Sequence, residues 1–282
     1  VEIDLLVLGD SLLFQKIWLR SVAVPDSFLC NLTSLIVEGC GFLSNAIIPS
    51  HLLHSLSNLE KLQVRKCNYA KAIFDETKMN NMGPASNPLS FRIKILILEQ
   101  LPILEHIWNE GPQGILSLPL LEKVIVDGCK GMKYLFPASE VKMDRLETLH
   151  VKNCDMLVEI WNEVQKRSLS LPLLEEVIVD GCTGIKSLFP ASEVKMVRLK
   201  TLHVINCDML VEIIAKQNIA AEKQNEKIFS SVTSLKLWNL PNLRWMFPGM
   251  DILKWPKLEE LDILHCQDSF LTKMASLSKV WL

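Results

Sequence analysis

The chain contains a long internal duplication. Residues 116–160 recur at residues 169–213, and 38 of the 45 aligned positions are identical. Each copy holds two shorter repeats of the pattern L-x-x-[LV]-x-V-x-x-C, where x is any residue. Chains built from such repeats stack them one after another, and each repeat buries its apolar residues against its neighbours. The sequence therefore predicts a solenoid rather than a domain built around one pocket, which favours binding over catalysis.

The same pattern continues outside the duplication in both directions. Successive repeats start 25 to 34 residues apart, and a weaker first repeat surrounds Leu6. We predict one domain over residues 1–282 with about nine to ten repeats. Two polar insertions, at residues 77–90 and 215–231, interrupt the spacing. Because the chain opens on Val1 inside a strand-like pattern, we expect it to be a fragment of a longer protein.

Within each repeat, apolar and polar residues alternate around the second and third apolar positions. A period of two is typical of a short strand with one buried face. Strands of successive repeats stack in parallel about 4.8 Å apart, and the rest of each repeat closes the core through turns, 3₁₀ segments or short helices. The predicted fold is an α/β repeat solenoid, curved, with a parallel β-sheet on its concave face.

Seven of the eight cysteines share the last position of a repeat. At that position a small buried residue with a weak donor can face the backbone of the turn. The chain contains no C-x-x-C pair, so zinc is disfavoured and structural thiols in a reducing compartment are predicted. The predicted ladder comprises Cys40, Cys67, Cys129, Cys154, Cys182, Cys207 and Cys266.

Charge and motifs disfavour several classes of function. A formal charge of −2 provides no field for nucleic acid, and no apolar run approaches the roughly 18–20 residues that span a bilayer. Nucleophile, phosphate-loop and metalloprotease motifs are absent from the sequence. His150 and His203 lie on strands about 10 Å apart, too far to share a metal. We predict no catalytic residue, no metal and no cofactor in this chain.

The outward residues of the predicted strands form the candidate binding surface. Isoleucine recurs at the central outward position, and acidic residues line one edge of the same face. Such a surface suits a protein partner. Strand propensity alone, or coverage by another part of the same chain, remains an alternative explanation. The predicted contacts are Ile97, Glu99, Lys123, Ile125, Asp127, His150, Lys152, Ile178, Asp180, His203, Ile205 and Trp238.

The two copies of the duplication differ mainly outside the predicted core. Lys123 in the first copy corresponds to Glu176 in the second, and Lys152 corresponds to Ile205. Core positions are kept except for one exchange of methionine for isoleucine. Packing constrains the core while the surface is free to change. These differences suit a binding surface that changes its partner by exchanging charges.

Three stretches carry a family resemblance: LEKLQVRKC at 59–67, LETLHVKNCDMLVEIW at 146–161 and SLKLWNLPNLRWMFP at 234–248. With the aromatic-proline step at Phe136-Pro137 and its equivalents, they resemble the C-terminal leucine-rich repeats of plant intracellular disease resistance proteins of the coiled-coil, nucleotide-binding class. The family's nucleotide-binding motif G-x-x-x-x-G-K-[ST] is absent from the chain.

The resemblance implies a recognition domain that senses pathogen effectors or the host proteins that effectors modify. It also implies that the domain restrains the receptor's nucleotide-binding module, in the cytoplasm or in both nucleus and cytoplasm. ATP or ADP would bind only in that module, outside this sequence. The alternative is a constitutive scaffold, or a substrate-recognition array of a ubiquitin ligase.

Overall fold

The computed structural model describes most of the chain. Two compact units are distinguished: an N-terminal unit of residues 1–132 and 139–143, and a C-terminal unit of residues 133–138 and 144–282. Each unit is described by itself, and the single domain expected over residues 1–282 stays a prediction. The described residues are 5–19, 29–75, 89–108, 116–136, 143–161, 168–189, 193–215, 229–246 and 255–278.

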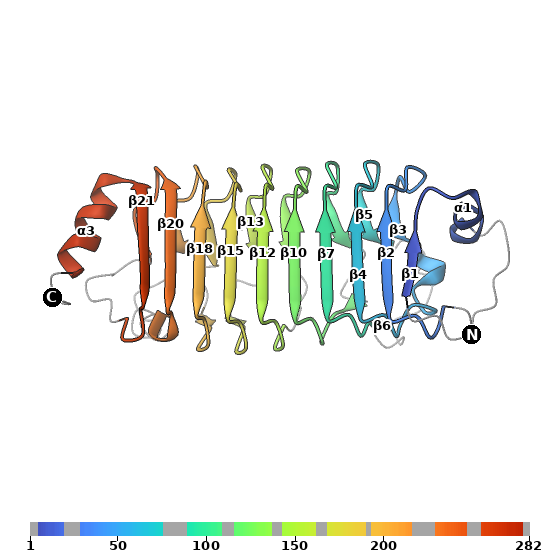
Figure 1. Cartoon of the computed structure of the whole chain (residues 1–282), viewed down its shortest axis with the longest axis horizontal. Coiled ribbons are helices and arrows are strands. Elements are labelled where there is room, and N and C mark those ends of the chain that lie inside the picture. The colour runs from blue at the N-terminus through green and yellow to red at the C-terminus, as the bar shows by residue number, and fades with distance from the viewer. Residues whose placement is uncertain are drawn as a thin grey trace. The chain divides into compact units, whose positions relative to one another are not determined.

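In the N-terminal unit one strand of each repeat joins a parallel sheet, and shorter strands return on the other side of the core (Figure 1). The sheet strands, in their order of pairing, are β1 (Leu5–Leu8), β2 (Ser34–Glu38), β4 (Lys61–Arg65), β7 (Ile95–Glu99) and β10 (Lys123–Asp127). The return elements are β3 (Ala46–Ile48), η2 (Ser50–Leu52), β5 (Ala72–Phe74), β6 (Leu89–Ser90), β8 (His106–Trp108) and β9 (Leu116–Ser117). Helix α1 (Leu12–Trp18) follows β1.

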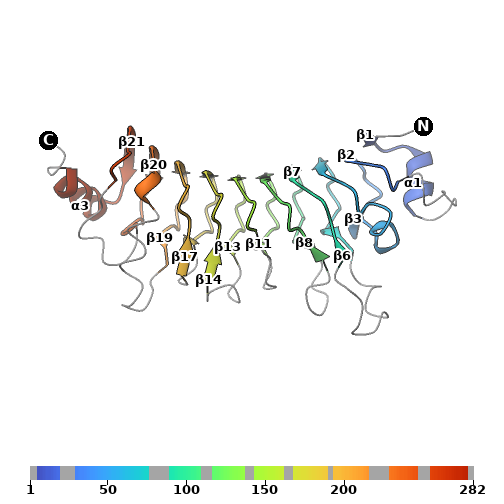
Figure 2. The same cartoon turned by 90° about the horizontal axis from the view of Figure 1, so that it is seen from below.

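The C-terminal unit repeats this plan. Its sheet strands, in their order of pairing, are β12 (Thr148–Lys152), β15 (Glu176–Asp180), β18 (Thr201–Ile205), β20 (Ser234–Leu240) and β21 (Glu260–Cys266). Its return elements are β11 (Tyr134–Phe136), β13 (Glu159–Trp161), β14 (Ser168–Ser170), β16 (Ser187–Phe189), β17 (Glu193–Lys195), β19 (Glu212–Ile214) and η6 (Phe229–Ser231). Helix α3 (Asp268–Ser278) follows β21, and Figure 2 shows the return strands on one side of the sheet.

The alternation of side chains explains the sheet strands. In β2, β4, β7, β10, β12, β15 and β18 the second and fourth residues are buried, while the first, third and fifth are half-exposed. Leu62 and Val64 of β4, for example, are fully buried. Burial of each such side chain contributes about 1.5–3 kcal/mol of transfer free energy. The predicted strand positions are therefore confirmed, and the solenoid fold with them.

The return side of the core is more extended than predicted. We expected turns, 3₁₀ segments or helical pieces, but most repeats place a three-residue strand there. These strands carry β-branched and aromatic residues, which favour extended backbone. In the C-terminal unit Phe136 of β11 stacks on Trp161 of β13, with ring centroids 4.8 Å apart. The aromatic part of the aromatic-proline step thus fills the core.

A left-handed residue lies near the C-terminal end of each sheet strand from β2 onward. The residue before the ladder position has φ between 51° and 69° in all nine repeats. At six of these positions the N–H donates to a carbonyl of the next strand, as from Gln100 to Asp127 at 2.7 Å and from Asn206 to Trp238 at 3.0 Å. The chain turns sharply there and is held by the following repeat. The nine residues are Gly39, Lys66, Gln100, Gly128, Asn153, Gly181, Asn206, Asn239 and His265.

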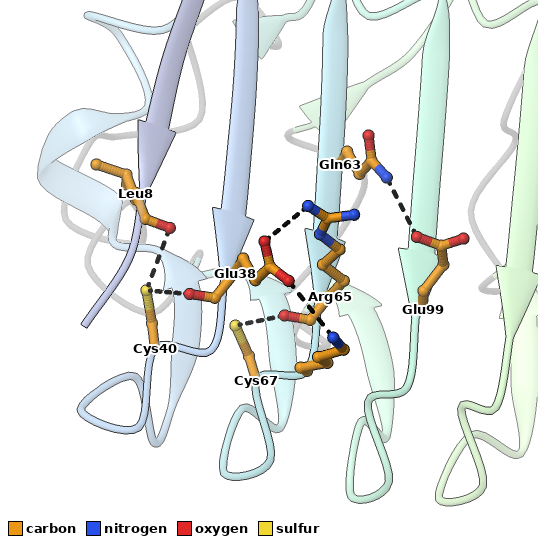
Figure 3. Close-up of polar contacts among 8 residues, drawn as sticks. Leu8, Glu38, Cys40, Gln63, Arg65, Cys67 and Glu99 are labelled. Carbon is orange, nitrogen blue, oxygen red and sulfur yellow. Dashed lines mark hydrogen bonds and ion pairs between the residues drawn. The ribbon is translucent and has the colours of Figure 1, made fainter.

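The seven cysteines of the predicted ladder are all buried, and none of them forms a disulfide, while Cys30 is half-buried. Each Sγ faces a backbone carbonyl, as from Cys154 to Lys152 at 3.2 Å and from Cys266 to Leu237 at 3.3 Å. Figure 3 shows the same arrangement for Cys40 and Cys67. Burial raises the pKa of Cys207 to about 12 and that of Cys266 to about 11. Cys207 and Cys266 therefore stay protonated and act as packing groups and weak donors.

The last repeat differs from its prediction. Leu261 of β21 occupies a predicted core position, yet 47% of its surface is exposed. Helix α3 follows the strand and buries Phe270. The sequence pattern of β21 predicts a strand, but it does not predict how much of that strand other elements cover. Of the two predicted insertions, residues 77–88 and 216–228 lie outside the described residues.

Candidate functional site

The outward side chains of the sheet strands form one exposed face in each unit, here called the N-terminal face and the C-terminal face. Strand pairing places equivalent residues side by side, so each face consists of three columns. The first, central and outer columns hold the first, third and fifth residues of each strand. All predicted contact residues are half-exposed at outward positions. They are Ile97, Glu99, Lys123, Ile125 and Asp127 on the N-terminal face, and His150, Lys152, Ile178, Asp180, His203, Ile205 and Trp238 on the C-terminal face.

The central column of the N-terminal face is apolar with one interruption. Ile36, Gln63, Ile97 and Ile125 are successive neighbours in it. The Gln63 amide donates from Nε2 to Glu99 Oε2 at 3.1 Å, so its polar group is turned towards the acidic edge. Ile97 and Ile125 are direct neighbours, and they form the apolar centre of this face.

Charges on the N-terminal face are balanced and partly paired. Arg65 lies between Glu38 and Glu99 in the outer column, and its guanidinium is 2.7 Å from Glu38 Oε2 (Figure 3). Lys66 approaches the other oxygen of Glu38 at 3.6 Å. The outward positions of β2, β4, β7 and β10 carry three acidic and three basic residues. This face therefore presents no net charge to a partner.

The neighbouring apolar residues of the C-terminal face lie in the outer column, whereas those of the N-terminal face lie in the central column. Its central column places Ile178 between His150 and His203, so the isoleucine is isolated. In the outer column Ile205 and Trp238 are neighbours, and Leu264 of β21 follows them. We had not included Leu264 among the contacts, although 47% of its surface is exposed. Its position in the repeat was sufficient to place it there.

Polar groups beside these residues form a hydrogen-bonded chain. Ser234 Oγ donates to Glu260 Oε2 at 2.6 Å and lies 2.9 Å from His203 Nε2. The serine hydrogen bond lowers the pKa of Glu260, and burial followed by the charge of Lys236 lowers the pKa of His203. At neutral pH the carboxylate is therefore charged and the imidazole neutral. Because the serine proton is directed to Glu260, His203 is not placed to activate Ser234 as a nucleophile.

Neither histidine of this face belongs to a metal site in the described structure. His150 Nε2 lies 3.2 Å from Glu176 Oε1, but the pair lacks the geometry of a hydrogen bond. No group of three His, Cys, Asp or Glu residues within the described ranges is arranged to hold a metal ion. The helices in these ranges are too short or too polar to cross a lipid bilayer.

A second polar chain, which the sequence analysis missed, borders the outer column. Asn206 donates from Nδ2 to Asp180 Oδ1 at 2.9 Å, and Asn239 donates from Nδ2 to Asn206 Oδ1 at 2.7 Å. His265 Nδ1 continues the chain at 3.1 Å from Asn239 Oδ1. Three of its members are left-handed turn residues, and asparagine tolerates that backbone best among non-glycine residues. These hydrogen bonds hold in place the edge of the C-terminal face beside Trp238.

Comparison with known proteins identifies the repeats. The family described as plant disease resistance protein RPS2-like, leucine-rich repeats, matches residues 2–155, 155–208 and 194–279. A protein of Arabidopsis thaliana, named as a candidate disease resistance protein, is 25% identical over 151 residues. That match covers 47% of this chain and 12% of the length of the relative. None of the solved structures matches the chain significantly.

Proposed function

Because this chain belongs to the leucine-rich repeats of RPS2-like plant disease resistance proteins, we propose that its sheet faces bind pathogen effectors or the host proteins that effectors modify. The observation that carries the proposal is the position of large apolar side chains on an outward face. Ile97 and Ile125 are neighbours on one face, and Ile205 and Trp238 on the other. Packing of the strands does not require apolar residues there, because the buried face already supplies the core.

The physical chemistry of these residues suits a protein partner. Interfaces concentrate their binding energy in a few desolvated apolar or aromatic side chains within a polar rim. On the C-terminal face Trp238 provides such a side chain, and the Asp180–Asn206–Asn239 hydrogen bonds provide a rigid polar rim. Rigid backbone also lowers the entropy cost of binding.

Regulation follows from the same surfaces. A face that binds the receptor's nucleotide-binding module at rest would hold an inactive arrangement until a ligand competes for it or stabilises another state. ATP or ADP would be held by that module and not by these repeats. We propose that this activity takes place in the cytoplasm, or in both nucleus and cytoplasm.

The test compares proteins captured by the chain from healthy and infected plant tissue. The variant is Ile125→Asp/Ile178→Asp, which puts a charge on each face. The matched control is Val197→Asp/Met209→Asp, which adds the same charges at exposed positions outside the faces. Position 197 tolerates aspartate by analogy, because Asp144 stands there in the first copy. Circular dichroism checks that all three proteins are folded.

We expect infection-dependent partners to be lost in the face variant and kept in the control. Partners that both variants retain would refute binding by the sheet faces. Partners lost only in the face variant but captured equally from healthy tissue would indicate a constitutive scaffold or ubiquitin-ligase array instead.

A further inference from the structure

The two copies of the duplication present different charges on equivalent strands. Lys123 of β10 corresponds to Glu176 of β15, and Lys152 of β12 corresponds to Ile205 of β18. All four side chains are half-exposed in strands of identical burial pattern. The backbone therefore accepts either residue. Both exchanges remove a positive charge from the second copy, and one of them adds a negative charge.

The outward positions of β15, β18, β20 and β21 are acidic, and one of their carboxylates, Glu176, comes from the exchange between the copies. These positions carry four carboxylates, Glu176, Asp180, Glu260 and Asp262, and one ammonium, Lys236. Lys152 of β12 lies beside Asp180 at the edge of this group. The Lys236 ammonium lies 4.8 Å from the centroid of the Trp238 ring and makes a cation–π contact with it. A cationic partner that approaches this face meets a favourable potential, which speeds its association and selects it over anionic proteins.

The apolar centre lies between the carboxylates. Ile205, Trp238 and Leu264 are neighbours in register on three successive strands, so they extend over about 10 Å. Glu176 and Asp180 lie on β15, before this group, and Glu260 and Asp262 lie on β21, at its other end. An apolar side chain seated against Ile205 and Leu264, beside Trp238, would therefore have acidic groups on both sides.

From this arrangement we infer the chemistry of the partner: a polypeptide segment with an apolar anchor flanked on both sides by lysine or arginine. The inference rests on the proposed function and names the partner class for the C-terminal face. Asp180 lies two strand spacings from Trp238 in the same column, about 10 Å away, and Asp262 lies one strand spacing and two residues away, about 8 Å. Glu176 and Glu260 lie at the other ends of their strands, about 14–16 Å from Trp238, and act on the partner through the potential of the face. An extended segment covers the distance to Asp180 or Asp262 in about two or three residues. The matching pattern is basic-x-apolar-x-basic.

The test exchanges the residues of the two copies. Glu176→Lys/Ile205→Lys gives the second copy the residues of the first, and Lys123→Glu/Lys152→Ile makes the reverse change. Each new residue already occurs at the equivalent strand position, so both variants should fold, and thermal melting checks this. The probes are three fluorescent peptides of equal length containing Lys-Gly-Leu-Gly-Lys, Glu-Gly-Leu-Gly-Glu or Lys-Gly-Ser-Gly-Lys. Binding to the whole 282-residue chain is measured by fluorescence anisotropy at low and at physiological salt.

We expect the lysine-leucine peptide to bind best, and more weakly at higher salt. The Glu176→Lys/Ile205→Lys variant should weaken it about tenfold or more, because charges and an apolar contact are lost together. The reverse variant should bind it at least as well as the unchanged chain. Equal binding of the acidic peptide, or unchanged binding by the first variant, would overturn the inference. If partner capture still depended on Ile125 and Ile178 in that case, the proposed function would stand and only the partner's chemistry would be wrong.

Discussion

The left-handed turn residues predict two substitutions with opposite effects on stability. Gln100 and Gly128 end the neighbouring strands β7 and β10, with φ of 53° and 69°. A Cβ costs about 1–2 kcal/mol in the left-handed region, whereas glycine loses about 0.5–1 kcal/mol more backbone entropy on folding. Gln100→Gly should therefore stabilise the chain by about 0.5–1 kcal/mol. Gly128→Ala should destabilise it by a similar amount, for the same reason.

Steric contacts of the added Cβ do not contribute to the expected effect of Gly128→Ala. A Cβ built on Gly128 meets its nearest heavy atom, Gln100 Cα, at 3.5 Å, which is ordinary van der Waals contact. The cost of Gly128→Ala is then the backbone conformation alone. Gly181 would be a poorer choice, because its Cβ would lie 3.0 Å from Asn153 Oδ1.

Urea unfolding followed by circular dichroism measures the two changes, and thermal melting should shift by about 2 °C in opposite directions. Gln100→Ala keeps the Cβ and serves as the control, with little change expected. If Gln100→Gly lowered stability as Gly128→Ala does, backbone conformation would not be what these positions select.

Other predictions concern buried thiols and surface ion pairs. Cys154→Asp should unfold its repeat locally, because it buries a charge at a site where the native Sγ lies 3.2 Å from the Lys152 carbonyl oxygen, and unchanged melting would contradict the placement of this residue. In the folded chain, Cys207 should react slowly with alkylating agents even at mildly alkaline pH, because its pKa is raised to about 12, and labelling as fast as in urea would contradict this. The hydrogen bond from Lys200 lowers the pKa of Glu175 below 4.5, so its contribution is present above that pH and is lost as the pH falls through the folded value. Glu175→Gln should cost less than about 1 kcal/mol at neutral pH, and nothing in acid, when urea unfolding is measured at both pH values.

The sheet was predictable because each strand carries its own signal. In Lys61–Arg65 the apolar residues alternate with polar ones, and the structure places a strand over those five residues. The left-handed turns were predictable only in part. Gly39 and Asn206 belong to residue types that accept positive φ, but Lys66 and Gln100 carry no such signal. There the hydrogen bond to the following strand decides the conformation.

The candidate site was predictable as positions and not as interactions. The period of two placed Trp238 on the outward face, and the structure agrees. It did not report that Lys236 covers the indole ring, nor that Ser234 joins His203 to Glu260, because those contacts depend on side-chain rotamers and neighbouring strands. Leu261 shows the same limit, since its exposure depends on what packs against β21.

The duplication has a consequence for how such genes change length. The two copies are offset by 53 residues, and they begin at equivalent short strands, β9 and β14. Unequal crossing-over between them would delete or add two whole turns of the coil. The daughter chain would keep its cysteine ladder and its strand register at the new junction. A lineage could therefore lengthen or shorten its parallel sheet in one genetic step, without passing through a protein that fails to fold.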